Sequence, residues 1–195
     1  SFNMAFKHIK KQKHILFLVS SMQGGGAEHV ASLLSTYWVK NGYRVTLMPT
    51  FSGRGVCLYP LDKRVTLDFL ADRAGNTDQN LFNRLRRFWM LRKAIQDIKP
   101  DVIISFLTHV NVAAILSALG TGIPVIVSER IYPPGYILDF VLSTLRKLTY
   151  PAASCVVMQT DQGLMWLKAK VSQDNGAVIA NPVSYPMIRA EPMCH

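Results

Sequence analysis

Short runs of apolar residues, rich in valine and isoleucine, recur along the chain, and within each run they do not alternate with polar residues. A strand with one face in water alternates, so continuous runs are typical of strands buried on both faces of a parallel sheet. The predicted strands are residues 15–20, 44–49, 65–69, 102–106, 125–127 and 155–158, with a seventh at 176–179.

The segments between these strands carry apolar residues at helical spacing. We predict helices at residues 27–41, 81–98, 110–119, 136–148 and 161–168. Strands that alternate with helices imply right-handed crossovers between parallel strands. The expected fold class is therefore α/β, with a doubly wound, mostly parallel, Rossmann-like sheet.

The chain divides into one domain with a segment on either side. Residues 1–13 form a basic extension, in which residues 1–3 precede the first methionine and are interpreted as the remnant of a tag. Residues 14–180 are expected to form a single domain, because 195 residues suit one large core. Residues 181–195 contain three prolines and are expected to be a hinge or linker to a further domain.

Composition restricts the partners and the compartment. Hydrophobic residues make up 49% of the chain and charged residues 17%, which is enough apolar surface for a core and excludes disorder for most of the chain. The net charge of +10 favours an anionic partner such as nucleic acid, acidic lipid or a phosphorylated ligand. The three cysteines are scattered, so they outline neither a disulfide framework nor a metal site and fit a reducing compartment.

Residues 102–128 contain no charged side chain, which raises the question of a membrane-spanning helix. We reject such a helix because His109, Asn111 and the breaker run at 120–124 would place polar groups and a helix end inside hydrocarbon. A strand, a helix and a second strand account for the same residues.

In an open parallel sheet, ligands bind beyond the carboxyl ends of the strands, so residues that directly follow a strand are candidates. The first strand is followed by Gly24, Gly25 and Gly26, whose backbone could approach a ligand and direct amides at a diphosphate. A tight turn that only allows close packing is the alternative. The loop matches neither the dinucleotide fingerprint nor a Walker loop. Glu28 lies in the first helical turn, where we expect it to cap the helix rather than to act in catalysis.

A second candidate loop follows the strand at 102–106 and holds Thr108, His109 and Asn111. A titratable ring and a carboxamide at a strand end suit sugar hydroxyls or a proton transfer. All three residues are candidates for acceptor binding, and His109 is also a candidate catalytic residue. A helix cap by Thr108 is the competing interpretation.

A third candidate loop holds Ser128, Glu129 and Arg130 directly after a buried apolar run. Glu129 could accept the proton of an acceptor hydroxyl, and Arg130 could bind phosphate. We take the three as candidates for acceptor binding and Glu129 as a candidate catalytic residue, with an ordinary surface ion pair as the alternative. In a fourth loop, Thr160 or Asp161 is expected to cap a helix.

The predicted helix at 81–98 combines an apolar stripe with basic residues. Its expected core stripe consists of Leu81, Leu85, Phe88, Ile95 and Ile98. Its other faces carry Arg86, Arg87 and Lys93, with Phe82 and Trp89 nearby. Cations beside interfacial aromatic rings suit an anionic membrane surface, and a solvated helix face is the alternative.

Four segments, taken in order, carry a family resemblance. They are Gly24-Gly25-Gly26-Ala27-Glu28, Lys99-Pro100-Asp101-Val102-Ile103 before Ser105-Phe106, Gly122-Ile123-Pro124-Val125-Ile126 before Ser128-Glu129-Arg130, and Ala180-Asn181-Pro182-Val183. Through this ordered set, which runs from about residue 14 to residue 183, the chain resembles the N-terminal domain of family four retaining glycosyltransferases of GT-B type. These enzymes build bacterial polysaccharides and lipid-linked glycans.

The resemblance implies one half of a two-domain GT-B architecture, in which a nucleotide-diphosphate sugar lies between two facing α/β domains. A C-terminal domain would hold the donor through a Glu-x7-Glu motif, which should follow the hinge and lies beyond this sequence. The N-terminal domain binds the acceptor and lends its glycine loop, here Gly24, Gly25 and Gly26, to the donor diphosphate. One departure is His29, where these enzymes often carry arginine.

The resemblance further implies hexosyl transfer to a polysaccharide or lipid-linked acceptor, with neither a metal nor another cofactor. The enzyme would work in the cytoplasm or peripherally on the inner face of the cytoplasmic membrane, and this fragment alone should be inactive. A basic nucleic-acid-binding module is the alternative, but the chain shows no recognition motif and its basic residues are spread out. A dehydrogenase-type cofactor domain would need a third fingerprint glycine. We therefore expect no nucleic acid partner.

Overall fold

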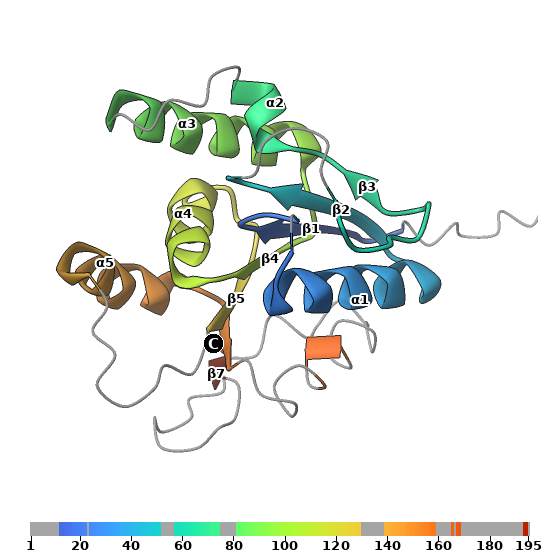
Figure 1. The fold of residues 1–195 in the computed structure, drawn as a ribbon. Coiled ribbons are helices and arrows are strands. Elements are labelled where there is room, and N and C mark those ends of the chain that lie inside the picture. Colours follow the sequence, from blue (N-terminus) through green and yellow to red (C-terminus); the bar gives the residue numbers. More distant parts are fainter. Residues whose placement is uncertain are drawn as a thin grey trace, which may run out of the picture.

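A computed structural model describes residues 12–22, 24–51, 57–74, 81–129, 139–158, 165, 167–168 and 193–194 (Figure 1). Several predicted segments lie outside these residues: most of the N-terminal extension, the strand at 176–179, most of the helix at 161–168 and nearly all of the hinge. The predicted domain boundaries therefore remain predictions.

Within the described residues, the strands form one seven-stranded sheet with the order β3-β2-β1-β4-β5-β6-β7. They are β1 (His14–Val19), β2 (Arg44–Pro49), β3 (Thr66–Leu67), β4 (Val102–Phe106), β5 (Val125–Glu129), β6 (Cys155–Met158) and β7 (Met193–Cys194). All neighbours from β3 to β6 pair in parallel, and β7 adds an antiparallel strand beside β6. The strand order changes direction between β1 and β4, as in a doubly wound sheet, so the predicted fold class is confirmed.

Helices cover both faces of this sheet (Figure 1). On one face lies α1 (Gly26–Lys40). On the other lie α2 (Leu70–Ala74), α3 (Leu81–Ile98), α4 (Thr108–Ala118) and α5 (Phe140–Thr149). In this second layer α4 packs between α3 and α5, and a 3-10 turn (Tyr150–Ala152) connects α5 to β6.

Alternate side chains of β1 enter two different cores. Ile15, Phe17 and Val19 pack on the α1 face, whereas Leu16 and Leu18 pack on the face covered by α3 and α4. All five are buried. Because both faces are covered, the strand needs no polar position, which explains the continuous apolar run in the sequence.

Aromatic rings interlock in the α1-side core. The ring of Phe17 meets Trp38 of α1 edge to face at 5.4 Å between centroids and meets Phe106 of β4 at 4.9 Å. Such pairs add to the free energy gained by burying the rings themselves. The aromatic cluster therefore ties α1 to the two central strands.

The edges of the sheet depart from the predictions. β3 has two residues rather than the predicted five, although Val65 and Phe69 on either side of it are buried. The helix α2 was not predicted, because five residues are too few to show a helical period. β7 falls within the predicted hinge.

The core stripe predicted for α3 is wrong at its N-terminal end. Leu91 and Ile95 in the C-terminal half are buried, but the side chain of Leu85 is 55% exposed. Phe82 and Trp89 are exposed as well, so the first half of α3 presents apolar residues to the outside.

Within the described residues, no helix is long and apolar enough to cross a membrane. The charge-free stretch at 102–128 forms β4, α4 and the start of β5, as expected. Cys155 at the start of β6 is disulfide-bonded, which the scatter of cysteines along the sequence did not indicate, and Cys57 is a free thiol.

Candidate active site

The candidate site lies at the carboxyl edge of the sheet, where β1 and β4 stand side by side. After β1 the chain turns to α1 on one face of the sheet, and after β4 it turns to α4 on the other face. Loops that diverge in this way leave a crevice between them. Across this crevice, Nε2 of His109 lies 3.4 Å from Oγ of Ser20. The loops predicted to bind ligand are thus brought together by the strand order.

The glycine loop is held in a conformation that favours glycine. Gly24 and Gly25 both have φ of +135°, a backbone region that residues with a Cβ rarely adopt. A Cβ on Gly25 would lie 2.4 Å from Oε2 of Glu28. The backbone conformation therefore favours glycine at Gly25, whereas the carboxylate of Glu28, at the end of a flexible side chain, can move aside for a Cβ.

Tyr59 fixes the same loop from outside. The amide of Gly25 donates to the Tyr59 hydroxyl at 3.1 Å, and that hydroxyl donates to the Gly25 carbonyl at 2.9 Å. The amide of Leu58 also donates to the carbonyl of Met22 at 3.0 Å. The Gly25 amide is therefore already occupied here, and a diphosphate at the loop would have to draw on other amides or displace Tyr59.

Glu28 makes a different contact from the expected cap. The N-cap residue of α1 is Gly25, which makes no side-chain cap hydrogen bond, and Glu28 instead accepts a hydrogen bond from the Ser21 hydroxyl at 3.0 Å. The carboxylate lies in the first helical turn, where its charge still favours the helix dipole. It also places a negative charge beside the loop proposed for an anion.

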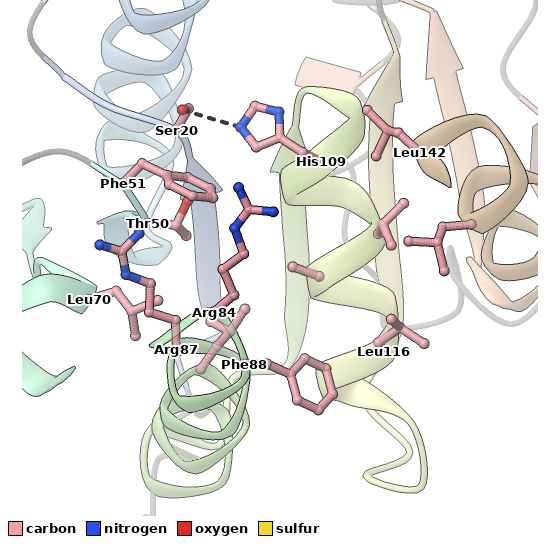
Figure 2. A pocket seen from close by; sticks show the side chains of 14 residues that line it. Ser20, Thr50, Phe51, Leu70, Arg84, Arg87, Phe88, His109, Leu116 and Leu142 are labelled. Carbon is pink, nitrogen blue, oxygen red and sulfur yellow. Dashed lines mark hydrogen bonds between the residues drawn. The ribbon is translucent and has the colours of Figure 1, made fainter. Parts of the chain in front are cut away.

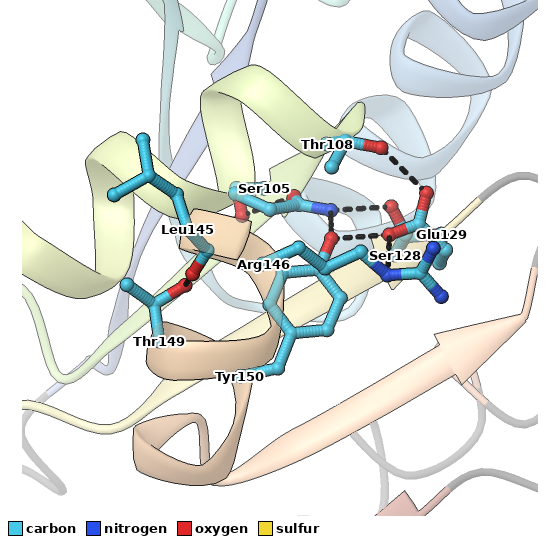
Figure 3. A network of polar contacts seen from close by, with 9 residues as sticks. Ser105, Thr108, Ser128, Glu129, Leu145, Arg146, Thr149 and Tyr150 are labelled. Atoms are coloured by element: carbon cyan, nitrogen blue, oxygen red, sulfur yellow. Dashed lines mark hydrogen bonds and ion pairs between the residues drawn. The ribbon is translucent and has the colours of Figure 1, made fainter. Parts of the chain in front are cut away.

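A buried polar network joins the ends of β4 and β5 to α5 (Figure 3). Glu129 is 1% exposed and accepts hydrogen bonds from the Thr108 hydroxyl at 2.7 Å and from the Tyr150 hydroxyl. Nε of Arg146 lies 3.7 Å from the same carboxylate. The donors and the guanidinium offset the cost of burying the charge of Glu129.

The electrostatics of this network act most strongly on Tyr150. Burial, followed by the neighbouring carboxylate of Glu129, raises the pKa of Tyr150 well above its ordinary value. The phenol therefore keeps its proton at neutral pH and remains a donor to Glu129.

Asn111 uses both ends of its amide inside the same network. Its Oδ1 accepts from the Ser105 hydroxyl at 2.7 Å, and its Nδ2 donates to the Ser128 carbonyl at 2.9 Å and to the Tyr150 hydroxyl at 3.1 Å. The side chain is fully buried. Asn111 thus connects β4, β5 and the 3-10 turn that follows α5.

The predicted site residues separate into two groups. Thr108, Asn111, Ser128 and Glu129 are buried, with only the Ser128 hydroxyl lacking a partner among the described residues, and Arg130 lies outside those residues. Their roles in acceptor binding and catalysis stay predictions. Both alternative interpretations are wrong, because Thr108 donates to Glu129 instead of capping α4 and Glu129 is not at the surface.

His109 is the predicted residue that opens onto a cavity. Its ring meets Phe51 edge to face at 5.1 Å, and Cζ of Arg87 lies 5.6 Å from the centre of the Phe51 ring. Partial burial lowers the pKa of His109. The imidazole is therefore neutral at pH 7 and can accept a proton.

The cavity beside His109 has a volume of about 670 Å³ and lies between α3, α4 and α5 (Figure 2). Its walls are mainly apolar: Phe88 and Leu91 of α3, Val112 and Leu116 of α4, and Leu142 and Leu145 of α5. Arg84 and Arg87 of α3, with Ser20 and Thr50, supply polar groups at one end. The cavity suits a ligand with an apolar body and an anionic or hydroxylated end.

Sequence reasoning missed Phe51, Tyr59 and Tyr150. Phe51 closely follows β2, so the rule that ligands bind after strands could have identified it. Tyr59 and Tyr150 gave no such signal, because their partners are 34 and 21 residues away along the chain.

Comparison with known proteins identifies the family of the chain and its fold. Residues 24–185 match the family described as Glycosyltransferase Family 4. A Campylobacter jejuni protein named GalNAc-alpha-(1->4)-GalNAc-alpha-(1->3)-diNAcBac-PP-undecaprenol alpha-1,4-N-acetyl-D-galactosaminyltransferase is 30% identical over 138 residues. That alignment spans 70% of this chain and 37% of the relative, so this chain covers well under half of the relative's length.

Solved structures share the fold. Acinetobacter baumannii MurG superimposes with a TM-score of 0.51 at 17% identity, over 76% of this chain and 42% of MurG. Sucrose-phosphate synthase from Thermosynechococcus elongatus gives 0.58 at 12% identity, over 83% of this chain and 46% of the synthase. This domain thus corresponds to one half of a two-domain fold. Because the family match covers most of its length, the chain belongs to Glycosyltransferase Family 4.

Proposed function

We propose that this chain is the acceptor-binding domain of a glycosyltransferase that moves a hexosyl group from a nucleotide-diphosphate sugar to a lipid-linked or polysaccharide acceptor. The observation that carries the proposal is the apolar cavity beside His109, with Arg84 and Arg87 in its wall. The Campylobacter relative is named for an acceptor whose glycan is joined through a diphosphate to undecaprenol. Apolar walls suit such a chain, and guanidinium groups suit its diphosphate.

The proposed reaction uses few groups of this domain. The acceptor oxygen bonds to the anomeric carbon of the donor, the bond from that carbon to the diphosphate breaks, and the acceptor hydroxyl releases its proton. We propose that His109 receives this proton, since its neutral ring faces the cavity. Gly24, Gly25 and Gly26 would lie against the diphosphate, whose negative charge grows as the bond breaks. No metal or other cofactor is invoked.

The arginines of the cavity provide the direct test. In the full-length enzyme, with a detergent-dispersed lipid-linked acceptor, changing Arg84→Glu and Arg87→Glu together should raise the KM for the acceptor at least about tenfold, because two attractive charges become repulsive. The KM for the donor should stay unchanged. Arg86→Glu is the matched control, since Arg86 is exposed on α3 and does not line the cavity. Equal acceptor KM values in all three proteins would contradict the proposal.

The glycine loop is tested by turnover. Gly25→Val in the full-length enzyme should lower turnover at least about tenfold, equivalent to about 1.4 kcal/mol of lost transition-state stabilisation. A normal melting temperature must accompany the loss. A variant that melts normally and keeps its turnover at saturating donor would leave the loop as a packing turn.

The 195-residue chain itself should transfer no sugar, because the donor would be held mainly by a second domain. Robust transfer by this chain alone would contradict that expectation. The family match does not favour the nucleic-acid-binding alternative, which salt-dependent binding to DNA or RNA would revive.

We further propose that the enzyme works in the cytoplasm, peripherally at the inner face of the membrane. Arg86 and Lys93 on α3 are exposed and form no salt bridge within the described residues. Each cation near an anionic surface contributes about 1 kcal/mol. Charge reversal at both positions should therefore weaken flotation with anionic vesicles at low salt.

A further inference from the structure

A single residue, Leu107, connects β4 to α4. The strand ends at Phe106 and the helix begins at Thr108. Leu107 is the N-cap residue of α4, with φ of +76° and ψ of 142°. Residues with a Cβ rarely adopt positive φ, and a bulky side chain there indicates strain. The turn that leads into the first residues of α4 is therefore strained.

Lys99 is the other residue besides glycine with positive φ within the described part of the chain, and an ordinary helix end accounts for it. It directly follows α3, has φ of +49°, and donates its amide to the carbonyl of Ile95 at 2.9 Å. Helices commonly end on one residue in the left-handed region. Leu107 begins a helix instead, where that rule does not apply, so its conformation has to be held by the surrounding structure.

The end of β5 holds the first turn of α4 (Figure 3). The hydroxyl of Thr108 donates to Oε1 of Glu129 at 2.7 Å, and Nδ2 of Asn111 donates to the carbonyl of Ser128 at 2.9 Å. On the strand side of the turn, Phe106 pairs with Ser128 in the sheet. Both sides of the turn are thus fixed to the same strand, and the strained conformation cannot relax while these contacts last.

His109 directly follows Thr108, so the direction of its side chain depends on this turn. Its Nε2 lies 3.4 Å from Oγ of Ser20, and its ring meets Phe51 edge to face at 5.1 Å (Figure 2). The contact with Ser20 is long for a hydrogen bond, and the ring is only partly buried. These two neighbours therefore hold the ring loosely, and the backbone has to supply most of its orientation.

We propose that Thr108 and Glu129 are positioning residues. The hydrogen bond between their side chains keeps Leu107 in its strained conformation and thereby holds the ring of His109 in the crevice between the β1 and β4 loops. Neither residue needs to touch the donor or the acceptor. The inference rests on the proposed function, in which His109 receives the proton of the acceptor hydroxyl. It differs from the catalytic role predicted for Glu129, because the buried carboxylate acts through Thr108.

The Thr108 hydroxyl provides the direct test in the full-length enzyme, with a detergent-dispersed lipid-linked acceptor. Thr108→Val keeps the shape of the side chain but removes the hydroxyl. It should lower kcat at least about tenfold, because a small displacement of a proton acceptor costs much of the rate. The KM values for donor and acceptor should stay within about twofold. Thr108→Ser restores the hydroxyl and should recover most of the lost turnover.

Thr149→Val is the matched control. Thr149 is also a buried threonine, and its hydroxyl donates at 2.7 Å to the carbonyl of Leu145 instead of to Glu129. This variant should keep the kcat of the wild type. An equal loss of kcat in Thr149→Val and Thr108→Val would overturn the inference, and so would a Thr108→Ser enzyme as slow as Thr108→Val. Thr108→Ala, which removes the same hydroxyl without added bulk, repeats the test if Thr108→Val does not melt cooperatively.

A second measurement does not depend on sugar transfer. The rate at which diethyl pyrocarbonate modifies His109, followed by mass spectrometry of the full-length enzyme, reports how closely the ring is held. Thr108→Val should raise this rate at least about threefold, because the ring leaves its neighbours, whereas Thr149→Val should leave it unchanged. Equal rates in wild type and Thr108→Val would overturn the inference.

His109→Asn separates failure of this inference from failure of the proposed function. If His109→Asn turns over like wild type, the proposed proton transfer to His109 is wrong, and the modification rates alone decide whether Thr108 positions the ring. If His109→Asn is slow, a wild-type kcat in Thr108→Val overturns the inference and leaves the proposed function standing.

Discussion

The two faces of the sheet differ in how tightly side chains pack and in how much apolar surface they expose. On the α1 face, the rings of Phe17, Trp38 and Phe106 interlock, and a pocket of about 540 Å³ is lined mostly by exposed and half-buried residues of α1 and of 59–62. On the opposite face, α3, α4 and α5 enclose a cavity of about 670 Å³ and leave Trp89, Phe140 and other large apolar side chains exposed.

The difference indicates that packing on the α1 face contributes more to the stability of the domain than packing on the face that holds the cavity. Filling a cavity and covering apolar side chains would both stabilise a folded chain. On the second face the cavity is unfilled and large apolar side chains stay exposed, and this is the face that adjoins His109. We therefore expect substitutions on the α1 face to act on folding and substitutions on the second face to act on binding.

The largest expected effect breaks the α1-side core. Phe17→Ala should lower the free energy of unfolding by about 3–5 kcal/mol, because it leaves a cavity between α1 and the central strands. Leu116→Ala is the comparison on the second face, where the side chain lines an existing cavity. It should cost less than about 1.5 kcal/mol. Urea denaturation of both variants measures the difference, and equal losses would refute the contrast between the faces.

The next effect compares two candidate residues of the site. Glu129→Ala should cost about 2–4 kcal/mol, because it removes the carboxylate that accepts from the Thr108 and Tyr150 hydroxyls and that pairs with Arg146. His109→Ala should cost less than about 1 kcal/mol, since the side chain is only partly buried and makes one long hydrogen bond. Melting curves of both variants measure the loss of stability. A large loss for His109→Ala with none for Glu129→Ala would make His109, and not Glu129, the residue that stabilises the fold.

The sequence predicted the sheet well and the site only in part. A strand buried on both faces can be recognised from its own residues, because a covered strand such as β4 is apolar at nearly every position. The rule that ligands bind after parallel strands identified the glycine loop and His109, which do meet across the β1 and β4 crevice. The pattern could not show that Glu129 is enclosed, since Arg146 reaches it from α5 and Tyr150 from the 3-10 turn that follows.

The glycine loop should show a smaller effect. Gly25→Ala should cost about 1–2 kcal/mol, because φ of +135° disfavours any residue with a Cβ. Gly26→Ala is the matched control, since it begins α1 and a Cβ there meets no atom within 4 Å. It should be neutral or slightly stabilising. Equal destabilisation of both variants in denaturant titrations would show that the backbone conformation of Gly25 is not the cause.

The smallest expected effect is a dependence of the free energy of unfolding on pH that arises from the buried His14. His14 is buried on β1, and Nε2 of its ring lies 2.7 Å from Oγ1 of Thr46. Burial, followed by the charge of Arg44, lowers the pKa of His14 below its usual 6.5, and Asp101 opposes this only in part.

Because the pKa in the folded state is depressed, the unfolded chain binds a proton first as the pH falls. The contribution of a neutral His14 is therefore complete above pH 6.5 and is lost progressively from pH 6.5 down to the lower folded pKa. His14→Gln cannot titrate and keeps a hydrogen-bonding group near Thr46, so its free energy of unfolding should fall less than that of wild type across this window. His109→Asn should flatten the profile in the same direction, because partial burial lowers the pKa of His109 too. Urea titrations at a series of pH values between 8 and 5 measure both. Profiles for His14→Gln and wild type that stay parallel throughout would mean that His14 titrates alike in the folded and unfolded chain, and its burial would then have no electrostatic consequence.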